Sequence, residues 1–254
     1  MKKLLVLGES CRDIFVYCNA ERLAPDVPIP VLGIFEQREN PGMAANVERN
    51  IKNIFSNVDL YTNDKWREVT KTRYIHHDTN HMFIRVDTDH HIPRVKVEDI
   101  PLSDYDIIAI SDYNKGFLME EDIDYITKNH DNVFIDTKKI LGNWAENAKF
   151  IKINNYEYER SKDKINKKLE NKLIHTKGEH GAVFMGKTYP VPNKVEVKDT
   201  SGAGDSFFAA LIVKYIETGD IEESIKFANE CASEVVKHKG VTSIVRPDKK
   251  HKPE

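Results

Sequence analysis

The stretch Asp199-Thr200-Ser201-Gly202-Ala203-Gly204-Asp205-Ser206-Phe207 is a turn of small residues that leads directly into a helical pattern. Because Gly202, Ala203 and Gly204 carry little or no side chain, a ligand can approach their backbone closely. The first N–H groups of a helix lack internal partners and carry partial positive charge, so the turn predicts an anion site suited to phosphate. The helix is predicted because apolar residues recur on one face at Phe208, Leu211, Ile212, Tyr215 and Ile216.

Asp205 falls in the first turn of this expected helix, beside the anion site. A carboxylate at that place can accept a proton from a hydroxyl while the backbone holds a phosphoryl group in transfer. The alternative is an ordinary capped helix in which Asp205 only complements the helix dipole. A lone Gly-x-Gly-Asp string leaves both interpretations open, because short motifs also occur by chance.

Composition narrows the class of protein. The chain has 254 residues, of which 40% are hydrophobic, enough for one large α/β domain. Its formal net charge is −3 with both signs mixed along the chain, which gives no electrostatic case for a nucleic-acid or membrane-surface partner. The cysteines, Cys11, Cys18 and Cys231, form neither a disulfide framework nor a zinc pattern, so a cytoplasmic location is expected.

Short apolar runs alternate with helical patterns along most of the chain. This alternation predicts an α/β fold, with a mainly parallel sheet and helices on both faces. Strands are expected at Leu4–Gly8, Val58–Thr62, Asp106–Ile110, Val133–Asp136, Phe150–Ile153 and Lys172–Thr176. Helices are expected from about Met43 to Phe55, at Met119–Lys128, from Asp205 onward and at Ile221–Val235.

Two segments, 13–36 and 69–92, predict a small β lid on this single domain. The first contains Pro25, Pro28 and Pro30 and reads as irregular chain plus one edge strand, because proline cannot donate to a central ladder. The tripeptide that starts at Asn40 reads as a turn. The second segment reads as a hairpin.

A small sheet that projects from a core leaves exposed edges and an apolar face, which proteins usually cover. A homodimer that meets lid to lid is therefore expected. The candidates for its apolar face are Val31, Ile34, Phe35 and Ile84.

The string at 199–207 resembles the C-terminal signature of the ribokinase-like (PfkB) carbohydrate kinases. The resemblance implies a sugar substrate, with ATP and Mg²⁺ as cofactors. It also implies that Asp205 is the catalytic base and that Gly202, Ala203 and Gly204 form the anion hole.

Further motifs are similar to the heptose 7-phosphate kinases of ADP-heptose synthesis. They are Gly8, Asp13, Leu23–Val31, Asn40–Val47, Thr70–Ile75 and Ile84–Asp87. This similarity implies that Asp13, Gly42 and Asn46 bind sugar hydroxyls, and Asp13 follows the first strand, where open α/β sheets bind ligands.

The loop Ser111–Gly116 resembles the same family's loop at the substrate pocket, which implies roles for Asp112 and Lys115. Since that family uses a sugar phosphate, Lys115 with Arg73 and Arg85 is expected to bind the phosphate. The alternative is that the two arginines only pair with lid carboxylates such as Asp87.

The nucleotide side is implied by three weaker similarities. Asn154 and Glu157 match the family's Asn-x-x-Glu motif, and an amide with a carboxylate suits a water-rich Mg²⁺ site. Thr176, Lys177 and Gly178 match the family's ATP-binding turn, and Asn229 is the expected neighbour of the adenine.

Two departures from the heptose kinases keep other functions open. Met43 stands where that family has a glycine, and only Asn63–Glu68 occupies the place of a strand–helix unit. Another ribokinase-like sugar or nucleoside kinase is one alternative, and a catalytically inactive sugar-binding or regulatory protein is another. ATP consumption with a panel of sugars would separate them.

Two further patterns point to other chemistry. Gly181–Thr188 satisfies the P-loop string, but its middle is strand-like and the prolines after Tyr189 cannot open a helix, so a hairpin turn at Gly186-Lys187 is expected. The pairs His76-His77 and His90-His91 suggest a metal site, yet no carboxylate or cysteine spacing completes one.

Overall fold

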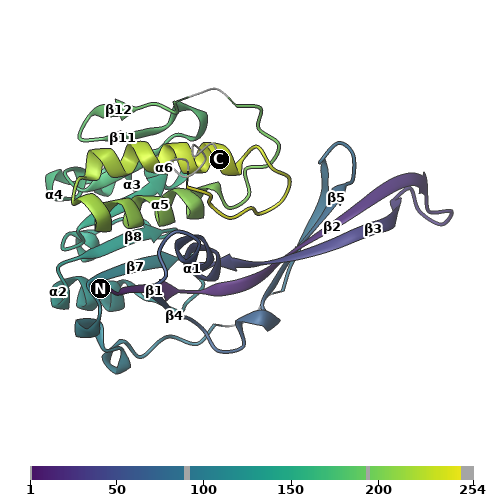
Figure 1. The fold of residues 1–254 in the computed structure, drawn as a ribbon. Coiled ribbons are helices and arrows are strands. Elements are labelled where there is room, and N and C mark those ends of the chain that lie inside the picture. The colour runs from purple at the N-terminus through teal and green to yellow at the C-terminus, as the bar shows by residue number, and fades with distance from the viewer. Residues whose placement is uncertain (1, 89–91, 193–194, 247–254) are drawn as a thin grey trace.

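The computed structural model describes residues 2–88, 92–192 and 195–246, and these form a large sheet between helices and a narrow sheet that extends away from it (Figure 1). The large sheet has eight strands in the order β12-β11-β10-β9-β8-β7-β1-β4 among the described residues. Their bounds are β1 Leu4–Gly8, β4 Val58–Tyr61, β7 Ile107–Asp112, β8 Val133–Thr137, β9 Phe150–Asn154, β10 Leu173–Thr176, β11 Ala182–Phe184 and β12 Lys187–Tyr189.

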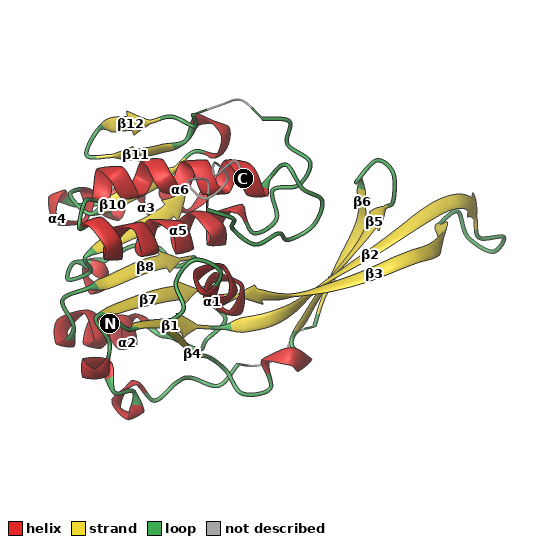
Figure 2. Cartoon of the chain, in the orientation of Figure 1, coloured by secondary structure: helices red, strands yellow, loops and turns green. Residues whose placement is uncertain are grey.

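The six strands from β4 to β10 in this order are parallel to one another, and only β11 and β12 run antiparallel. Helices cover both faces (Figure 2). On one face lie α1 (Ala44–Lys52), α5 (Ala203–Thr218) and α6 (Ile221–Val235), and on the other α2 (Glu120–Asn129), α3 (Asn155–Ser161) and α4 (Lys167–Glu170). The predicted α/β fold is confirmed.

The two faces follow from the period of two along a strand. In β1, Leu4 and Val6 enter the core under α5, whereas Leu5 and Leu7 enter the core on the other side. Parallel strands buried on both faces need continuous apolar runs, which is why these strands were evident in the sequence. Helix α5 is itself buried over Phe207–Val213, because α1 and α6 pack against it as well as the sheet. Short 3-10 helices complete the fold at Trp66–Glu68, Val97–Asp99, Leu102–Asp104, Asn143–Ala145, Lys162–Lys164 and Gly178–His180.

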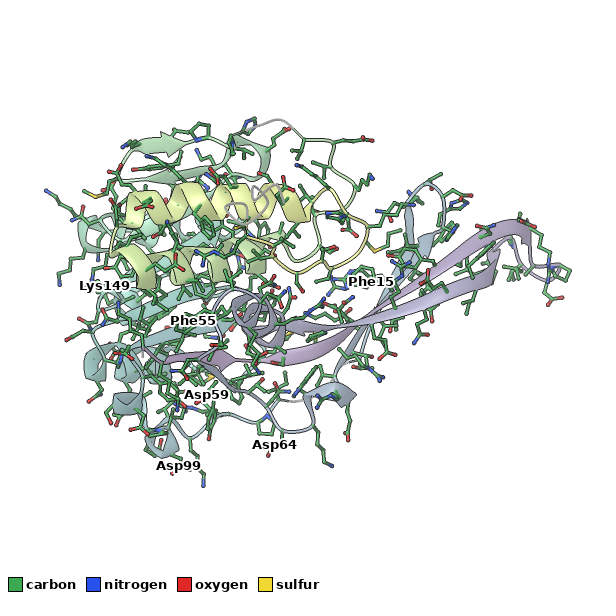
Figure 3. All side chains as sticks on the ribbon, in the orientation of Figure 1. Phe15, Phe55, Asp59, Asp64, Asp99 and Lys149 are labelled. Atoms are coloured by element: carbon green, nitrogen blue, oxygen red, sulfur yellow. The ribbon has the colours of Figure 1, made fainter. Side chains whose placement is uncertain are left out.

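The second sheet has four strands in the order β3-β2-β5-β6. Their bounds are β2 Ser10–Leu23, β3 Pro30–Met43, β5 Thr70–His76 and β6 Met82–Asp87. We call this sheet the lid; its strands overlap the predicted segments 13–36 and 69–92, the latter of which includes positions outside the described residues. Phe15, labelled in Figure 3, is buried near the base of the lid against Tyr17, Ile75 and Val241.

Two sequence predictions about the lid were wrong. Most of residues 14–36 form two long strands with two register shifts rather than irregular chain plus one edge strand, and Asn40–Gly42 continues β3 instead of turning. The prolines misled the prediction, but Pro25 and Pro28 fall in the connection between β2 and β3, while Pro30 starts β3. Because β3 is the edge strand of the lid, it tolerates Pro41 without losing a central ladder bond.

The lid exposes apolar side chains. Ile34, Phe35 and Ile84 are 66%, 63% and 53% exposed, whereas Val31 is half-buried.

Strand β4 forms one edge of the large sheet, and β12 forms the other. Among the described residues β4 pairs only with β1, and the chain from β4 to β5 contains just the 3-10 helix Trp66–Glu68. Within the described residues, no helix combines the length and apolar character needed to cross a bilayer.

Met43 joins β3 to α1 in a backbone conformation that L residues rarely adopt, with φ 60° and ψ −133°. Its side chain is nevertheless buried, at 2% exposure. The residue therefore combines local strain with apolar burial.

We predict that Met43→Gly is more stable than Met43→Ala by about 1 kcal/mol, because both lose the buried side chain but only glycine relieves the strain. Urea unfolding of the two variants measures the difference. At an unstrained helix position such as Val47, the same pair should show the usual order, with alanine the more stable. An alanine variant at 43 that equals or exceeds the glycine variant would contradict the strain.

Candidate functional site

A cavity of about 840 Å³ lies at the carboxyl ends of β7 to β10, the place where open parallel sheets bind ligands. The first turn of α5 and the last turns of α6 close its other side. Among the residues predicted from the sequence, its lining includes Gly202, Ala203, Gly204, Asp205, Asn154, Thr176, Gly178 and Asn229. Asp13, Gly42, Asn46, Arg85, Asp112, Lys115, Lys177 and Glu157 do not line it.

Gly202 starts α5 in the left-handed conformation, with φ 77° and ψ 0°. A Cβ at this position would lie 3.1 Å from Asn46 Nδ2 and 3.2 Å from Val241 Cγ1, so both the conformation and the space favour glycine. No side chain caps the start of α5. The positive end of the helix therefore faces the cavity, as an anion site requires.

The Asp205 carboxylate is buried and held by two hydrogen bonds from distant parts of the chain. Asn46 Nδ2 donates to Oδ2 at 2.8 Å, and the Tyr113 hydroxyl donates to Oδ1 at 2.7 Å. Burial raises the pKa of Asp205, as does the nearby Asp136, while these two hydrogen bonds and the charge of Lys152 oppose the rise. A carboxylate with a raised pKa is a stronger base, which suits proton transfer from a hydroxyl.

Asn46 lies in the first turn of α1, and its side chain is oriented by Asn50, whose Nδ2 donates to Asn46 Oδ1 at 3.3 Å and to the Asn46 backbone carbonyl at 2.8 Å. The resemblance implied that Asn46 binds a sugar hydroxyl. That role stays a prediction; in the structure the Asn46 amide donates to Asp205, so Asn46 brings α1 and α5 together at the carboxylate.

Asp13 was expected in a loop after β1 but lies within β2, where Arg73 Nη1 donates to its Oδ1 at 2.7 Å. On the neighbouring strand, a Cβ at Gly42 would lie only 2.6 Å from Asp13 Oδ2 and 2.7 Å from Cys11 Sγ. A glycine at 42 thus makes room for the Asp13 carboxylate. Burial raises the pKa of the Cys11 thiol to about 12, so this cysteine stays protonated.

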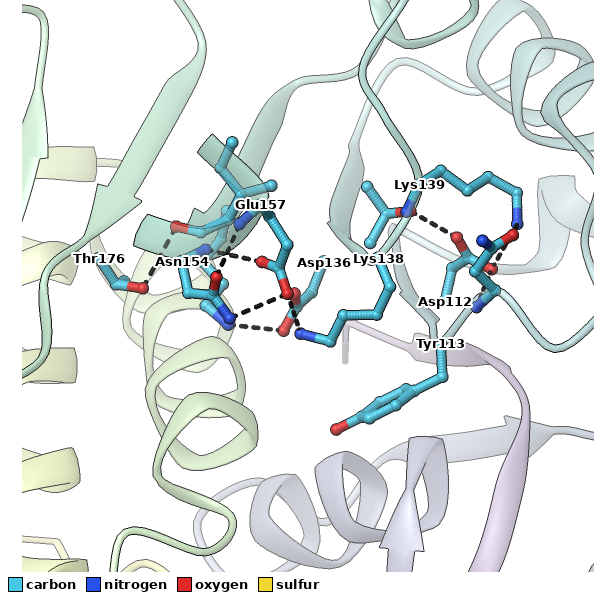
Figure 4. Close-up of polar contacts among 12 residues, drawn as sticks. Asp112, Tyr113, Asp136, Lys138, Lys139, Asn154, Glu157 and Thr176 are labelled. Carbon is cyan, nitrogen blue, oxygen red and sulfur yellow. Dashed lines mark hydrogen bonds and ion pairs between the residues drawn. The ribbon is translucent and has the colours of Figure 1, made fainter. Parts of the chain in front are cut away.

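Asp112, which was expected at the substrate, is held by neighbouring side chains and does not line the cavity. Asp112 is buried, and its carboxylate accepts from Lys139 Nζ at 2.9 Å and from the Thr137 hydroxyl at 2.5 Å. Figure 4 shows this carboxylate on the side of Lys139, apart from Glu157 and Asn154. Asp112 therefore anchors its loop, while Tyr113, its neighbour in sequence, lines the cavity.

Arg85 forms a two-pronged ion pair with Asp87, at 2.7 and 2.5 Å, the alternative anticipated from the sequence. Arg73 likewise pairs with a lid carboxylate, that of Asp13 on β2. Lys115 is exposed, and its backbone N–H donates to the buried Glu9 carboxylate at 2.8 Å.

Of the residues expected to bind the nucleotide, Thr176 and Gly178 line the cavity, whereas Lys177 is exposed outside it. Asn229 also lines the cavity, and its Nδ2 donates to the Tyr189 carbonyl at 2.8 Å. Asn229 thereby ties α6 to the hairpin of β11 and β12. The sequence predicted that the turn at Thr176–Gly178 and Asn229 belong to the same part of the site, and in the structure Thr176, Gly178 and Asn229 line one cavity.

Asn154 and Glu157 form a reciprocal cap at the start of α3. Asn154 Oδ1 accepts from the Glu157 N–H at 3.0 Å, and Glu157 Oε2 accepts from the Asn154 N–H at 2.7 Å. Glu157 also pairs with Lys138 (Figure 4). Asn154 and Glu157 thus cap α3, and Glu157 also holds Lys138; their role at a Mg²⁺ site stays a prediction.

Asp136 offers a better anchor for Mg²⁺. It lines the cavity, and its Oδ1 is buried without a hydrogen-bond partner. Since Mg²⁺ in nucleotide sites takes one or two carboxylates plus phosphates and waters, this donor set fits the ion. No group of three or more metal-ligating side chains occurs in the described part of the chain, and His90 and His91 lie outside it.

Sequence reasoning did not assign Tyr113, Asp136, Lys138 or Lys152, all of which line the cavity. The signal for Asp136 and Lys152 was present, because each interrupts an apolar strand that is otherwise buried. A charged side chain at such a position needs a partner or a function. For Tyr113 the signal lay within the loop already noted.

The P-loop string forms a hairpin, as expected. Residues Ala182–Phe184 and Lys187–Tyr189 pair antiparallel across a turn in which Met185 and Gly186 have positive φ. Lys187 forms an ion pair with Glu222 at the surface and does not line the cavity. The turn leads directly into strand β12 rather than into a helix that could hold a phosphate.

Comparison with known families agrees with this geometry: the family described as "pfkB family carbohydrate kinase" matches residues 106–248. The chain belongs to the pfkB family. It is thus a phosphotransferase of the carbohydrate kinase type. Among curated proteins it is similar to bifunctional protein HldE of Hydrogenovibrio crunogenus, at 27% identity over 95% of this chain, and of Helicobacter pylori strain Shi470, at 30% over 93%. The chain spans 61% and 63% of the length of these two relatives.

Solved structures of this pfkB-family fold resemble the chain throughout. Thermotoga maritima ribokinase superposes with a TM-score of 0.76 at 20% identity, covering 98% of this chain and 97% of that one. A Methanocaldococcus jannaschii nucleoside kinase superposes with a TM-score of 0.73, also at 20% identity, covering 98% and 96%. These similarities show the ribokinase fold.

The Tyr113 hydroxyl lowers the pKa of Asp205, so Tyr113→Phe should raise it. If ionised Asp205 is the base, kcat/KM falls as the pH drops through this pKa, and the acid limb of the profile should move to higher pH in the variant. Tyr156→Phe, which alters an exposed tyrosine at the cavity rim, is the control and should leave the limb in place. An unmoved limb, or one moved to lower pH, would argue against Asp205 as the titrating base.

Proposed function

We propose that this pfkB-family kinase transfers the γ-phosphate of ATP to a sugar hydroxyl, the C1 hydroxyl of a heptose 7-phosphate, with Asp205 as base. The observation that carries the proposal is the Asp205 carboxylate, held by Asn46 and Tyr113 where the first turn of α5 meets the cavity. The similarity to HldE and the motifs of the lid favour heptose over other sugars.

In this proposal ATP lies along the cavity, with its base near Asn229 and its phosphates directed to the first turn of α5. The sugar lies between Asp205 and the lid, near Asp13, Gly42 and Asn46. The attacking hydroxyl passes its proton to Asp205 as its oxygen bonds to the γ-phosphorus. The N–H groups of the turn at Gly202–Gly204 stabilise the transferring phosphoryl group.

Mg²⁺ fits beside Asp136, with Asn154 and Glu157 nearby, and when bound it would neutralise charge on the phosphates. The side chains and backbone of the site orient the two substrates and stabilise the developing charge, because phosphoryl transfer depends mainly on positioning and charge stabilisation. A cytoplasmic location, where ATP is available, stays a prediction.

The charge of the lid supports a phosphorylated sugar. Arg85 neutralises Asp87, but Lys71 and Lys115 lie close enough to lower the pKa of the same carboxyl further. Three cations therefore act on the Asp87 carboxylate, and the nearby Asp13 is balanced by Arg73, which leaves net positive charge near the proposed sugar site. A sugar phosphate would complement that excess.

The roles of Asp205 and Lys187 can be separated by two variants. Asp205→Asn keeps the size of the side chain but removes the proton acceptor, so turnover should fall by about 10²–10⁴-fold while ATP affinity stays similar. Lys187→Ala should change little, because that lysine pairs with Glu222 at the surface. A coupled assay for ADP release measures both, and the reverse order of effects would reject Asp205 as the base.

Substrate choice tests the heptose assignment. Heptose 7-phosphate should be turned over with a higher kcat/KM than free hexoses, and Arg85→Gln should raise KM for the sugar phosphate without affecting KM for ATP. Arg94→Gln, which removes an arginine paired with Asp122 away from the cavity, is the matched control. Turnover of free hexoses but of no sugar phosphate would overturn the heptose assignment and leave the kinase assignment intact.

We also propose that the chain forms a two-fold homodimer through the exposed apolar face of the lid. Ile34→Glu should shift a dimer to monomer in sedimentation at micromolar concentration, because it places a charge in the apolar contact. Met185→Glu, at an exposed methionine on the β11–β12 turn, should leave the dimer intact. A monomeric parent chain at that concentration would refute the proposal.

A further inference from the structure

Lys152 carries a buried ammonium group in the middle of an apolar strand. Its neighbours Ile151 and Ile153 pack into the core on the face of α2, so the period of two directs Lys152 to the face of α5. Its side chain is 3% exposed, and it lines the cavity.

The partner of Lys152 is Asp136 on the adjacent strand. The two residues are directly paired in register between β8 and β9, and Lys152 Nζ lies 2.8 Å from Asp136 Oδ2. The second carboxylate oxygen, Oδ1, is buried without a hydrogen-bond partner. The ion pair is therefore incomplete on the Asp136 side, and both residues border the cavity.

Stability does not account for this pair. Desolvating two charges costs free energy that their attraction repays only with good geometry, and apolar replacements of buried pairs are often neutral or stabilising. A strand that alternates isoleucines would accept an apolar residue at 152. A buried pair kept at the edge of a ligand cavity instead indicates a role in that cavity.

The Lys152 ammonium also lies against the turn Gly202–Gly204, where the anion site is proposed. A Cβ on Gly204 would lie 3.2 Å from Lys152 Nζ, which places the ammonium directly against the first turn of α5. Its charge is felt by Asp205, whose pKa it lowers. The helix N-terminus and a fixed cation thus converge on one point of the cavity, beside the carboxylate proposed as base.

We propose that Lys152 is a catalytic residue whose ammonium group donates hydrogen bonds to the phosphoryl group in transfer, and that Asp136 is the positioning residue that holds it against α5. The inference rests on the proposed function. It adds a protein cation to the backbone donors at Gly202–Gly204, where negative charge is greatest during the reaction.

The step is a single displacement at the γ-phosphorus. The sugar oxygen forms the new bond to phosphorus while the bond from phosphorus to the β,γ-bridging oxygen breaks, and its electron pair leaves with ADP. The hydroxyl proton goes to Asp205. Lys152 keeps its protons throughout and stabilises the non-bridging oxygens of the transferring group.

The test compares Lys152→Met with the wild-type enzyme in turnover and in binding. We expect kcat to fall about 10²–10³-fold, the usual effect of losing one preorganised donor. Affinity for ADP, which lacks the transferring group, should stay within about threefold. Affinity for ADP with aluminium fluoride, which imitates that group, should fall at least tenfold in calorimetry.

Lys152→Met leaves the Asp136 charge unpaired and can impair folding. Lys152→Gln is therefore measured alongside it, since its amide still donates to a carboxylate but carries no charge. Lys172→Met is the matched control, because Lys172 Nζ donates to the Glu146 carbonyl away from the cavity. That control should leave all three constants unchanged.

Two results would overturn the inference. One is that folded Lys152→Gln or Lys152→Met keeps kcat and the affinity for ADP with aluminium fluoride within threefold of the wild-type values. The other is an equal loss of ADP and ADP–aluminium fluoride affinity, which indicates a purely structural role. If the wild-type chain transfers phosphate to no sugar, the proposed function fails, yet the two binding constants still decide the role of Lys152.

Discussion

The buried carboxylate of Asp205 is the constraint on which the rest of the structure depends. Burying an ionisable group is costly unless it is hydrogen-bonded, and its partners here, Asn46 and Tyr113, are 159 and 92 residues away in sequence. To satisfy one carboxylate, α1, α5 and the loop after β7 must therefore meet at one point. At the same point the N-terminus of α5, which has no side-chain cap, faces the cavity.

The parallel sheet supplies the remaining groups. Because β7 to β10 run in the same direction, the residues at their carboxyl ends gather along one edge, and Asp136, Lys152, Asn154 and Thr176 line a common cavity. The antiparallel hairpin of β11 and β12 extends the sheet beside β10, and the Tyr189 carbonyl at its end accepts a hydrogen bond from Asn229 Nδ2. The phosphate site proposed on α5 and the carboxylate proposed for Mg²⁺ on β8 are thus parts of one arrangement.

The two departures from the heptose-kinase pattern noted in the sequence, Met43 and the short connection Asn63–Glu68, both lie outside the cavity lining. Met43 holds a strained backbone at the junction of the lid and α1, and β4 is left as an edge strand followed by a short connection. The cavity lining and α5 fall within residues 106–248, the part of the chain that the family matches, whereas the lid lies before it. The phosphate-transfer half therefore supports the kinase assignment most directly, and the lid half carries the proposal about the sugar.

The sequence by itself determined the α/β fold and the anion turn, because buried parallel strands need continuous apolar runs and a phosphate-binding turn needs small residues before a helix. It also separated the false P-loop at Lys187 from the turn before Asp205. Only the tertiary structure decided that Asp112 turns to Lys139 while Tyr113 reaches Asp205, since adjacent residues after a strand point to opposite sides. The pairing of Asp136 with Lys152 was likewise decided by strand register, which local sequence does not encode: two charges in separate apolar strands become one site only when β8 and β9 align.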